Sequence, residues 1–275
     1  MKKILFVTDL YYNAKGRNYY EEDLFLTCAL REDFKLLICN PKDLNDFHED
    51  FDLILFRNTG PATNFEKEYK IFRDKIKTHN LLTYNSFDGH GDMNGKSYLM
   101  ELSNKNMPVI RTINNINEFH KLPDVANYII KPIDGADSIE LEFLSKDELF
   151  EKVKSDDYST LIQPFIDFQY EVSFYYVDKK FQYALYAPNK EKRWQMEEYT
   201  PNKDGFDFCH TLLNWNNLSH GIQRIDACRD NNGNLLLVEM EDLNPYLSLL
   251  DISPSSREKF VLSLKESLNN ILYKR

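Results

Sequence analysis

The sequence predicts an α/β protein (α+β in detail) in which a parallel N-terminal lobe precedes two lobes built on antiparallel sheets. In the first 85 residues, short apolar runs alternate with segments of helical spacing, as in a parallel sheet covered by helices. Further along the chain, strand-like runs come in pairs joined by turns, as in antiparallel hairpins. The chain has 275 residues, enough for several small lobes. We predict an N-terminal domain at 1–85, a small lobe at 86–160 and a C-terminal lobe at 161–275.

In the N-terminal domain, four continuous apolar runs predict buried strands and two segments of helical spacing predict helices. The strands are expected at 4–8, 34–39, 51–56 and 81–84, and the helices at 21–30 and 64–79. Ligands of parallel sheets bind at the carboxyl ends of the strands. Arg57 directly follows the third strand and is a candidate for bidentate contact with a substrate carboxylate, although an ordinary surface arginine fits the position equally well.

The rest of the chain mixes hairpins and helices. A helix is expected at 96–104, and a hairpin at 128–144 whose first strand ends in Lys131. Strands separated by a break at Pro164 follow at 161–177 and pair with 181–186. A long polar loop is expected at 190–207, a helix at 208–218, and an amphipathic helix after Pro254.

The glycine-bearing segment 89–97 suggests two phosphate-binding motifs and fits neither. A P-loop requires glycine at position 90, which is His90, and the spacing of Gly89, Gly91 and Gly95 does not fit a dinucleotide-binding turn. We interpret both matches as accidental.

The most informative stretch is 221–247, which reads as two strands joined by a turn at 231–234. Alternation places Glu239 and Glu241 on one face of the second strand, where Asp226 of the first strand can join them. Carboxylates that converge beside an apolar strand need a positive charge among them, and oxygen ligands suit Mg²⁺. Arg224 is the other local positive charge. The alternative is a surface hairpin with solvated acids, which the apolar run 235–238 disfavours.

Composition limits the classes of partner and the cellular compartments that fit this protein. A net charge of -10 argues against a nucleic-acid backbone as the main partner. Four cysteines without CxxC spacing predict reduced thiols in a cytoplasmic protein. No apolar stretch approaches the length of a membrane span, and the first ten residues read as a strand rather than a signal segment.

Taken in order, these segments resemble the ATP-grasp superfamily of ATP-dependent carboxylate–amine ligases, which includes D-alanine–D-alanine ligase and glutathione synthetase. The resemblance spans nearly the whole chain, and no single motif decides it. It rests on Asn94 and Lys96 before a helix, the segment 107–112 (MPVIRT), the segment 129–132 (IIKP), the segment 161–166 (LIQPFI), Glu171, Arg224-x-Asp226 and Glu239-x-Glu241.

The resemblance implies a role for each matching residue. Lys96 and Lys131 would contact the phosphates of ATP. Gln163 and the backbone near Phe165 would bind adenine, and Glu171 would bind ribose. Asp226, Glu239 and Glu241 would hold Mg²⁺, and Arg224 would stabilise the transferred phosphoryl group as the catalytic residue. Arg57, Arg193 and Asn244 are our candidates for contact with the substrate.

Two departures from the family pattern concern the phosphate flap and the metal site. The flap at 133–138 has one glycine and two acids, and Glu241 stands where an asparagine is usual, with Pro245 one residue late.

The predicted activity is amide formation between a small carboxylate and an amine of amino-acid or peptide-like character. The loops 9–20 and 190–207 would line the acceptor pocket. An ATP-grasp kinase and a non-catalytic nucleotide-binding protein are the alternatives. A homodimer is compatible with the resemblance, because dimers are common among similar folds.

Overall fold

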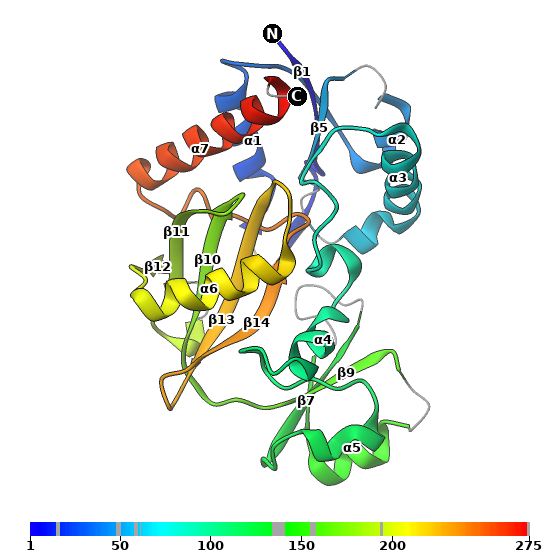
Figure 1. Ribbon diagram of the computed structural model, residues 1–275, viewed down its shortest axis with the longest axis vertical. Coiled ribbons are helices and arrows are strands. Elements are labelled where there is room, and N and C mark those ends of the chain that lie inside the picture. Colours follow the sequence, from blue (N-terminus) through cyan, green and yellow to red (C-terminus); the bar gives the residue numbers. More distant parts are fainter. Residues whose placement is uncertain are drawn as a thin grey trace.

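The N-terminal lobe is a parallel four-stranded sheet with the order β4-β1-β5-β6 (Figure 1). Its strands are β1 (Lys3–Val7), β4 (Lys35–Cys39), β5 (Leu53–Phe56) and β6 (Thr83–Tyr84), and its helices are α1 (Glu21–Leu30), α2 (Leu44–Phe47) and α3 (Glu66–His79). The computed structural model describes residues 1–14, 17–47, 51–57, 60, 62–133, 141–154, 158–192 and 195–273. The predicted strands and helices of this lobe are confirmed, with shifts of a few residues at their ends.

The small lobe is an antiparallel sheet with the order β8-β7-β9, and α5 packs against it. Its elements are β7 (Asn127–Pro132), β8 (Glu142–Ser145), α5 (Lys146–Lys152) and β9 (Thr160–Pro164). Ser145 and Glu148 form a capping box that fixes the start of α5. Because β9 pairs with β7, the small sheet extends to Pro164, a few residues beyond the predicted limit.

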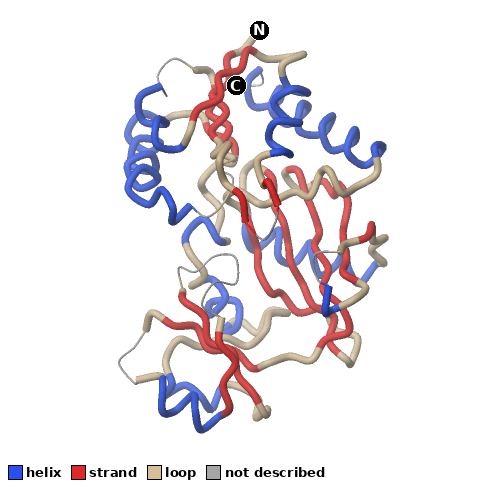
Figure 2. The backbone as a smooth tube through the Cα atoms, turned by 180° about the vertical axis from the view of Figure 1, so that it is seen from behind, coloured by secondary structure: helices blue, strands red, loops and turns tan. Residues whose placement is uncertain are grey.

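The C-terminal lobe is an antiparallel sheet with the order β12-β11-β10-β13-β14. Its strands are β10 (Phe168–Val177), β11 (Lys180–Ala187), β12 (Glu197–Glu198), β13 (Ile222–Asp230) and β14 (Leu235–Glu241). Helix α6 (Lys203–Asn216) covers one face, and α4 (Tyr98–Asn104) packs into the same hydrophobic cluster. From behind, the strands of this sheet lie in front of α6 (Figure 2). The α4 segment, which we predicted in the small lobe, is therefore part of the C-terminal core.

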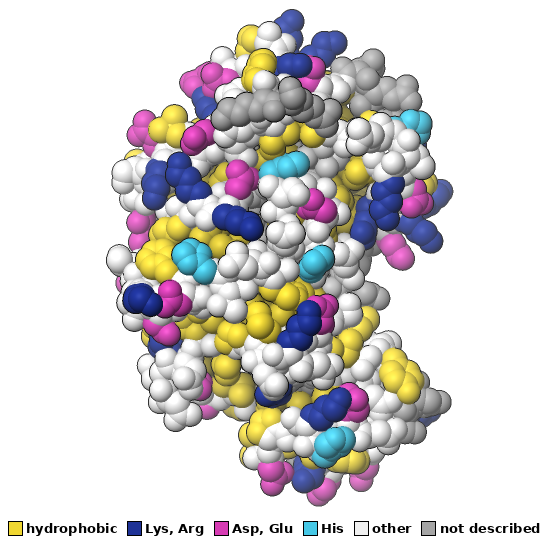
Figure 3. Space-filling view, in the orientation of Figure 1, with side chains coloured by type: hydrophobic (Ala, Val, Ile, Leu, Met, Phe, Trp, Pro, Cys, Tyr) yellow, Lys and Arg dark blue, Asp and Glu magenta, His cyan; other side chains and the backbone are white. Residues whose placement is uncertain are grey.

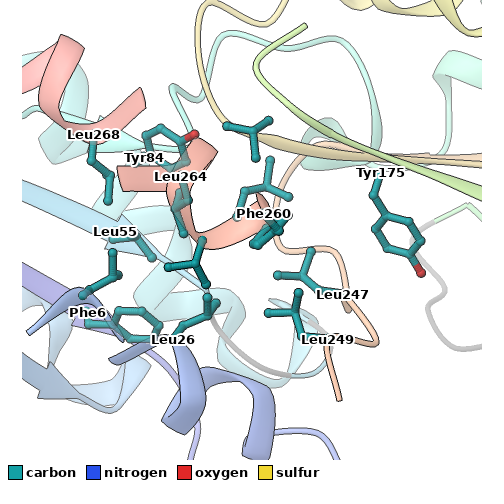
Figure 4. Packing of buried hydrophobic residues seen from close by; sticks show 14 of the residues in the cluster. Phe6, Leu26, Leu55, Tyr84, Tyr175, Leu247, Leu249, Phe260, Leu264 and Leu268 are labelled. Carbon is teal, nitrogen blue, oxygen red and sulfur yellow. The ribbon is translucent and has the colours of Figure 1, made fainter. Parts of the chain in front are cut away.

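The last helix, α7 (Pro254–Tyr273), joins the two large lobes. Its buried residues Phe260, Leu264 and Leu268 lie in one cluster with Phe6 of β1 and Leu26 of α1 (Figure 4). The same cluster contains apolar side chains of β10 and β11, including Tyr175 and Tyr183. Helix α7 thus covers one end of the sheet face opposite α6 and holds it against the N-terminal sheet.

The predicted loop at 190–207 is wrong in its second half. Helix α6 starts at Lys203, where the side chain of Asn202 accepts a hydrogen bond from the amide of Gly205. This cap satisfies a backbone donor that would otherwise lack a partner, so the helix begins one turn before its apolar residues. Short strands β2 (Asn13–Ala14) and β3 (Arg17–Asn18) also pair within the predicted loop at 9–20. Among the described residues, no helix has the length and apolar character to cross a membrane.

Candidate active site

The face of the five-stranded sheet opposite α6 changes from apolar to charged where α7 no longer covers it. The register of β13 and β14 pairs Arg224 with Glu241 and Asp226 with Glu239. Carboxylate oxygens of Asp226, Glu239 and Glu241 all lie within 4.8 Å of one another. The structure thus brings together the three acids that alternation in the sequence placed on one face.

Arg224 lies in the middle of these acids. Its Nε donates to Asp226 Oδ1 at 3.0 Å, and its Nη2 lies 2.7 Å from Asp226 Oδ2 and also contacts Glu241. Its Nη1 donates to the carbonyl of Tyr246 at 3.0 Å. Burial raises the pKa of Glu241 to about 8, although Arg224 opposes this effect. Removal from water therefore outweighs the single guanidinium, and the acids would be more stable with more positive charge beside them.

Two lysines reach the acids from other segments. Lys96 Nζ lies 2.9 Å from Glu239 Oε1, and its backbone amide donates to the carbonyl of Ile133 at 3.0 Å. Burial alone would raise the pKa of Glu239, but the Lys96 ammonium holds it below its usual value. Lys131 comes from β7 of the small lobe, and burial lowers the pKa of its ammonium to about 8, with Glu239 opposing and Lys96 reinforcing the shift. A buried ammonium that has lost its hydration is stabilised by an anion beside it, so this site favours the binding of an anionic ligand.

The glycine-bearing segment 89–97 is the support that positions Lys96. Asp242, which follows β14 and is fully buried, accepts hydrogen bonds from the amides of Gly91 and Met93 at 2.9 and 3.0 Å. In return Asp92 accepts from the amides of Asp242 and Leu243 at 2.7 and 3.2 Å. A Cβ atom at Gly91 would lie 2.8 Å from Asp242 Cγ, so glycine is needed for this close approach. The segment is therefore a backbone clasp on the end of β14 and not a phosphate loop.

The sequence did not single out Tyr98, Asp92 or Asp242 as site residues. The hydroxyl of Tyr98 accepts from the amide of Met240 at 2.7 Å and so fixes β14 between its two acids. Asp242 directly follows the Glu-x-Glu pattern, and this third acid in four residues was the available signal.

The predicted adenine contacts are placed differently from expectation. Gln163 is buried, and its Nε2 donates to Thr112 Oγ1 at 2.8 Å. The backbone amide of Phe165 donates to the carbonyl of Asn127 at 2.9 Å, so it is not free to read the edge of a base. Its ring is 40% exposed and lies 5.8 Å from the ring of Phe143. Phe165 therefore offers a ligand an exposed aromatic side chain, while its amide hydrogen is already bound to Asn127.

The expectation that Arg57 binds a substrate carboxylate is contradicted by its surroundings. Its side chain is 2% exposed and donates to Asp23 Oδ1 at 2.9 Å, Glu22 Oε1 at 2.8 Å and the carbonyl of Pro245 at 2.8 Å. A guanidinium with two carboxylate partners in the interior cannot reach a ligand. The two acids lie on α1, more than 30 residues away in sequence, and strand-end position alone did not indicate them.

The remaining predicted contacts divide into three cases. Glu171 lies on β10, half-buried, where it faces Ala187 and Cys228 in the register of the sheet. Asn244 donates to the carbonyl of Gly60 at 2.8 Å and so connects the end of β14 to the N-terminal lobe. Arg193 lies outside the described residues.

No family model and no curated protein matches the sequence. Among solved structures, the D-cycloserine synthetase DcsG is similar with a TM-score of 0.74 at 17% identity, over 97% of this chain and 99% of that one. The D-alanine–D-alanine ligase from Bacillus anthracis is similar with a TM-score of 0.69 at 14% identity, over 100% of this chain and 99% of that one. The chain has the ATP-grasp fold. A further ATP-grasp structure, macrocyclase MdnC with its precursor peptide MdnA from Microcystis aeruginosa MRC, has a TM-score of 0.68 at 11% identity, over 99% of this chain and 100% of that one.

The ATP-grasp fold confirms the predicted architecture, a parallel N-terminal lobe followed by two lobes with antiparallel sheets. In this chain the segment 108–113 connects the two ATP-grasp sheets. Ile110 donates its amide to Leu237 of β14 at 3.2 Å, and Ile113 exchanges backbone hydrogen bonds with Ile162 of β9. The small lobe with Lys131 is thereby tied to the strand that carries the acids.

Proposed function

We propose that this protein is an ATP-dependent ligase that joins a carboxylate and an amine through an acylphosphate. The observation that carries the proposal is the meeting of three carboxylates, one arginine and two lysines between the two antiparallel sheets. The three basic side chains, together with a divalent cation held by the three acids, would neutralise the charge of a triphosphate and hold it in place, which is most of what phosphoryl transfer requires. No side-chain nucleophile is needed for this chemistry.

The donor set fits Mg²⁺. Asp226, Glu239 and Glu241 offer only oxygen atoms, and these converge to within 4.8 Å. Hard divalent cations prefer carboxylate oxygens, and Mg²⁺ binds through a few carboxylates together with substrate phosphates. When bound, the ion would neutralise phosphate charge and would stabilise the ionised form of Glu241, whose pKa is raised by burial and also by the neighbouring Asp226 and Glu239.

Each residue of the site then has a task. Lys96 and Lys131 bind phosphate oxygens of ATP, and the exposed ring of Phe165 and the carboxylate of Glu171 bind the nucleoside. A substrate carboxylate oxygen attacks the γ-phosphorus, ADP leaves, and an acylphosphate forms. The amine then attacks the acyl carbon, inorganic phosphate leaves and the amine loses a proton, which gives the amide. Arg224 stabilises the charge on the transferred group in both steps.

The substrate side lies where the N-terminal lobe meets the end of β14. Half-buried tyrosine rings line this junction, with centroids of Tyr12 and Tyr19 5.4 Å apart and those of Tyr19 and Tyr246 4.6 Å apart. We propose a small amino-acid-derived or peptide-like substrate, in keeping with the names of the similar structures, a cycloserine synthetase, a dipeptide ligase and a peptide macrocyclase. On the face shown in Figure 3, the coloured basic and acidic side chains are interspersed, which does not favour a nucleic-acid backbone as a partner.

The proposal is tested by the release of ADP in a screen of carboxylate and amine pairs with Mg·ATP. A ligase releases ADP and phosphate in amounts equal to the amide formed, and only when both substrates are present. ADP release with a single hydroxyl substrate, together with a phosphorylated product, would instead establish the kinase alternative.

The pKa of Lys131 predicts how ATP binding depends on pH. In the free protein this ammonium has a pKa of about 8, and the phosphates of bound ATP would raise it. ATP binding should therefore take up a proton above pH 8, and affinity should fall by up to about tenfold per pH unit there. Below pH 7 the lysine is already charged, so affinity should no longer change through this group.

Calorimetry at pH 8.5 in two buffers of different ionisation enthalpy measures the proton uptake directly. Lys131→Arg is the matched variant, because arginine stays charged at every pH used and should abolish the uptake. Equal binding enthalpies in both buffers for the wild-type protein would contradict the assignment of Lys131 to the phosphates.

A further inference from the structure

The chain that leaves β14, residues 243–249 (hereafter the exit loop), is largely buried, and side chains from other segments bind its backbone. The carbonyl of Pro245 accepts from Arg57 at 2.8 Å and that of Tyr246 from Arg224 at 3.0 Å. The carbonyl of Leu247 accepts from the hydroxyl of Tyr183 at 2.6 Å. Buried backbone groups need such partners, and here they come from both large lobes. Side chains of other segments thus fix the position of the exit-loop backbone.

The N-terminal lobe contributes a buried ion cluster to this fixation. Glu22 is 1% exposed, and its carboxylate accepts from the amides of Leu247 at 2.9 Å and Leu249 at 3.4 Å. The same carboxylate pairs with Arg57, which also binds Asp23. Arg57 and Glu22 therefore hold a carbonyl and two amides of one short loop. Only the planar guanidinium can contact both carboxylates and the carbonyl at once.

Arg57 and Arg224 bind neighbouring carbonyls of the same loop. The other contacts of Arg224 in the described structure are to Asp226 and Glu241, two of the acids assigned to the metal. The carbonyl of Tyr246 is thus the contact of Arg224 that is uncharged and is not itself assigned to the metal. The exit loop, and not a metal ion, sets the position of this carbonyl. Whatever displaces the exit loop displaces the atom that orients the guanidinium.

We propose that Arg57 and Glu22 are positioning residues for Arg224, acting through the exit loop. The inference rests on the proposed function, in which Arg224 contacts the transferred phosphoryl group. It gives Arg57 a role in the reaction that does not involve contact with substrate, and it makes the N-terminal lobe part of the phosphoryl-transfer machinery.

The test compares the affinity of the protein for Mg·ADP with its affinity for Mg·ADP plus aluminium fluoride, which mimics the transferring phosphoryl group. No natural substrate is needed. Arg57→Lys breaks the ion cluster, and Tyr183→Phe removes only the hydroxyl that binds Leu247 and so preserves the fold. Both should reduce the gain in affinity from aluminium fluoride by about fivefold or more, since an aligned hydrogen bond is lost, while affinity for Mg·ADP alone stays unchanged.

Tyr84→Phe is the matched control. Tyr84 belongs to the same core cluster and is equally buried, but its hydroxyl donates to Ser267 Oγ at 3.1 Å. In Figure 4 it lies beside Leu264 and Leu268 of α7, away from Leu247 and Leu249. This variant should keep the full gain from aluminium fluoride.

An unchanged gain in Arg57→Lys and Tyr183→Phe would overturn the inference, and so would an equal loss in Tyr84→Phe, which would indicate general loosening of the core. The inference is also overturned if wild type binds Mg·ADP but gains nothing from aluminium fluoride, because Arg224 would then not recognise the transferred group. Absence of Mg·ADP binding in wild type would refute the proposed function itself.

Discussion

Replacement of Glu239 and Glu241 together by glutamine should abolish ligase turnover and the dependence of ATP binding on Mg²⁺. The change keeps the size of both side chains but removes two of the three carboxyl groups whose oxygens converge to within 4.8 Å. Loss of a residue that only supports a metal ligand costs about 10–100-fold in metal affinity, so loss of two ligands should cost more than about 100-fold. Calorimetry of ATP binding at a series of fixed Mg²⁺ concentrations measures how strongly the affinity for ATP depends on Mg²⁺ in each protein.

The matched control is Glu151→Gln with Glu197→Gln, which changes the net charge equally at two exposed positions. It should behave as wild type. If the Glu239→Gln/Glu241→Gln protein responds to Mg²⁺ as wild type does, the ion binds elsewhere and the assignment of the three acids is wrong.

Arg224→Lys should lower turnover by about 10²–10³-fold, as expected when a donor to a developing negative charge is lost. Lysine keeps one positive charge beside Asp226 and Glu241, so the charge balance of the site is unchanged and the fold should persist. It cannot also bind the carbonyl of Tyr246, so its ammonium has no fixed direction. Affinity for Mg·ATP should change by less than about threefold, because the interaction is made chiefly in the transition state.

Arg229→Lys provides the comparison on the same strand. Arg229 donates to the hydroxyl of Tyr170 and the carbonyl of Gly233, at the turn end of β13. Turnover should be nearly unchanged in this variant. If both variants lose turnover equally, Arg224 acts through the stability of β13 and not on the reacting group.

The two acids of β14 could be predicted because local pattern determines them. Alternation along β14 decides which side of the sheet Glu239 and Glu241 occupy. The turn at 231–234 sets only the pairing next to it, up to Ala227 and Leu237, and a bulge then shifts the register by one residue and brings Asp226 opposite Glu239. The sequence pattern did not indicate this bulge. Local pattern indicated that Lys131 lies near the end of a strand, where it pairs with Leu161 of β9. Its place beside the acids of the other lobe depends on how the two antiparallel sheets pack, for which the sequence has no local signal.

Long-range pairing explains the predictions that failed. Arg57 looked available because its partners Glu22 and Asp23 lie on a helix that precedes it by two strands, and no short-range pattern joins them. The clasp between Asp92 and Asp242 spans 150 residues, so the glycines at 89 and 91 could be excluded as a phosphate loop but not explained. Helix α6 began earlier than its apolar spacing indicated because the capping side chain of Asn202 decides its start.

Binding of ATP to the wild-type protein, measured by calorimetry with and without Mg²⁺, tests the central claim most directly. If the three acids, Arg224 and the two lysines form a phosphate and metal site, ATP should bind with one site per chain and markedly more tightly with Mg²⁺. Absence of ATP binding under both conditions would contradict the account, and the protein would then be an ATP-grasp fold without the nucleotide function proposed for it.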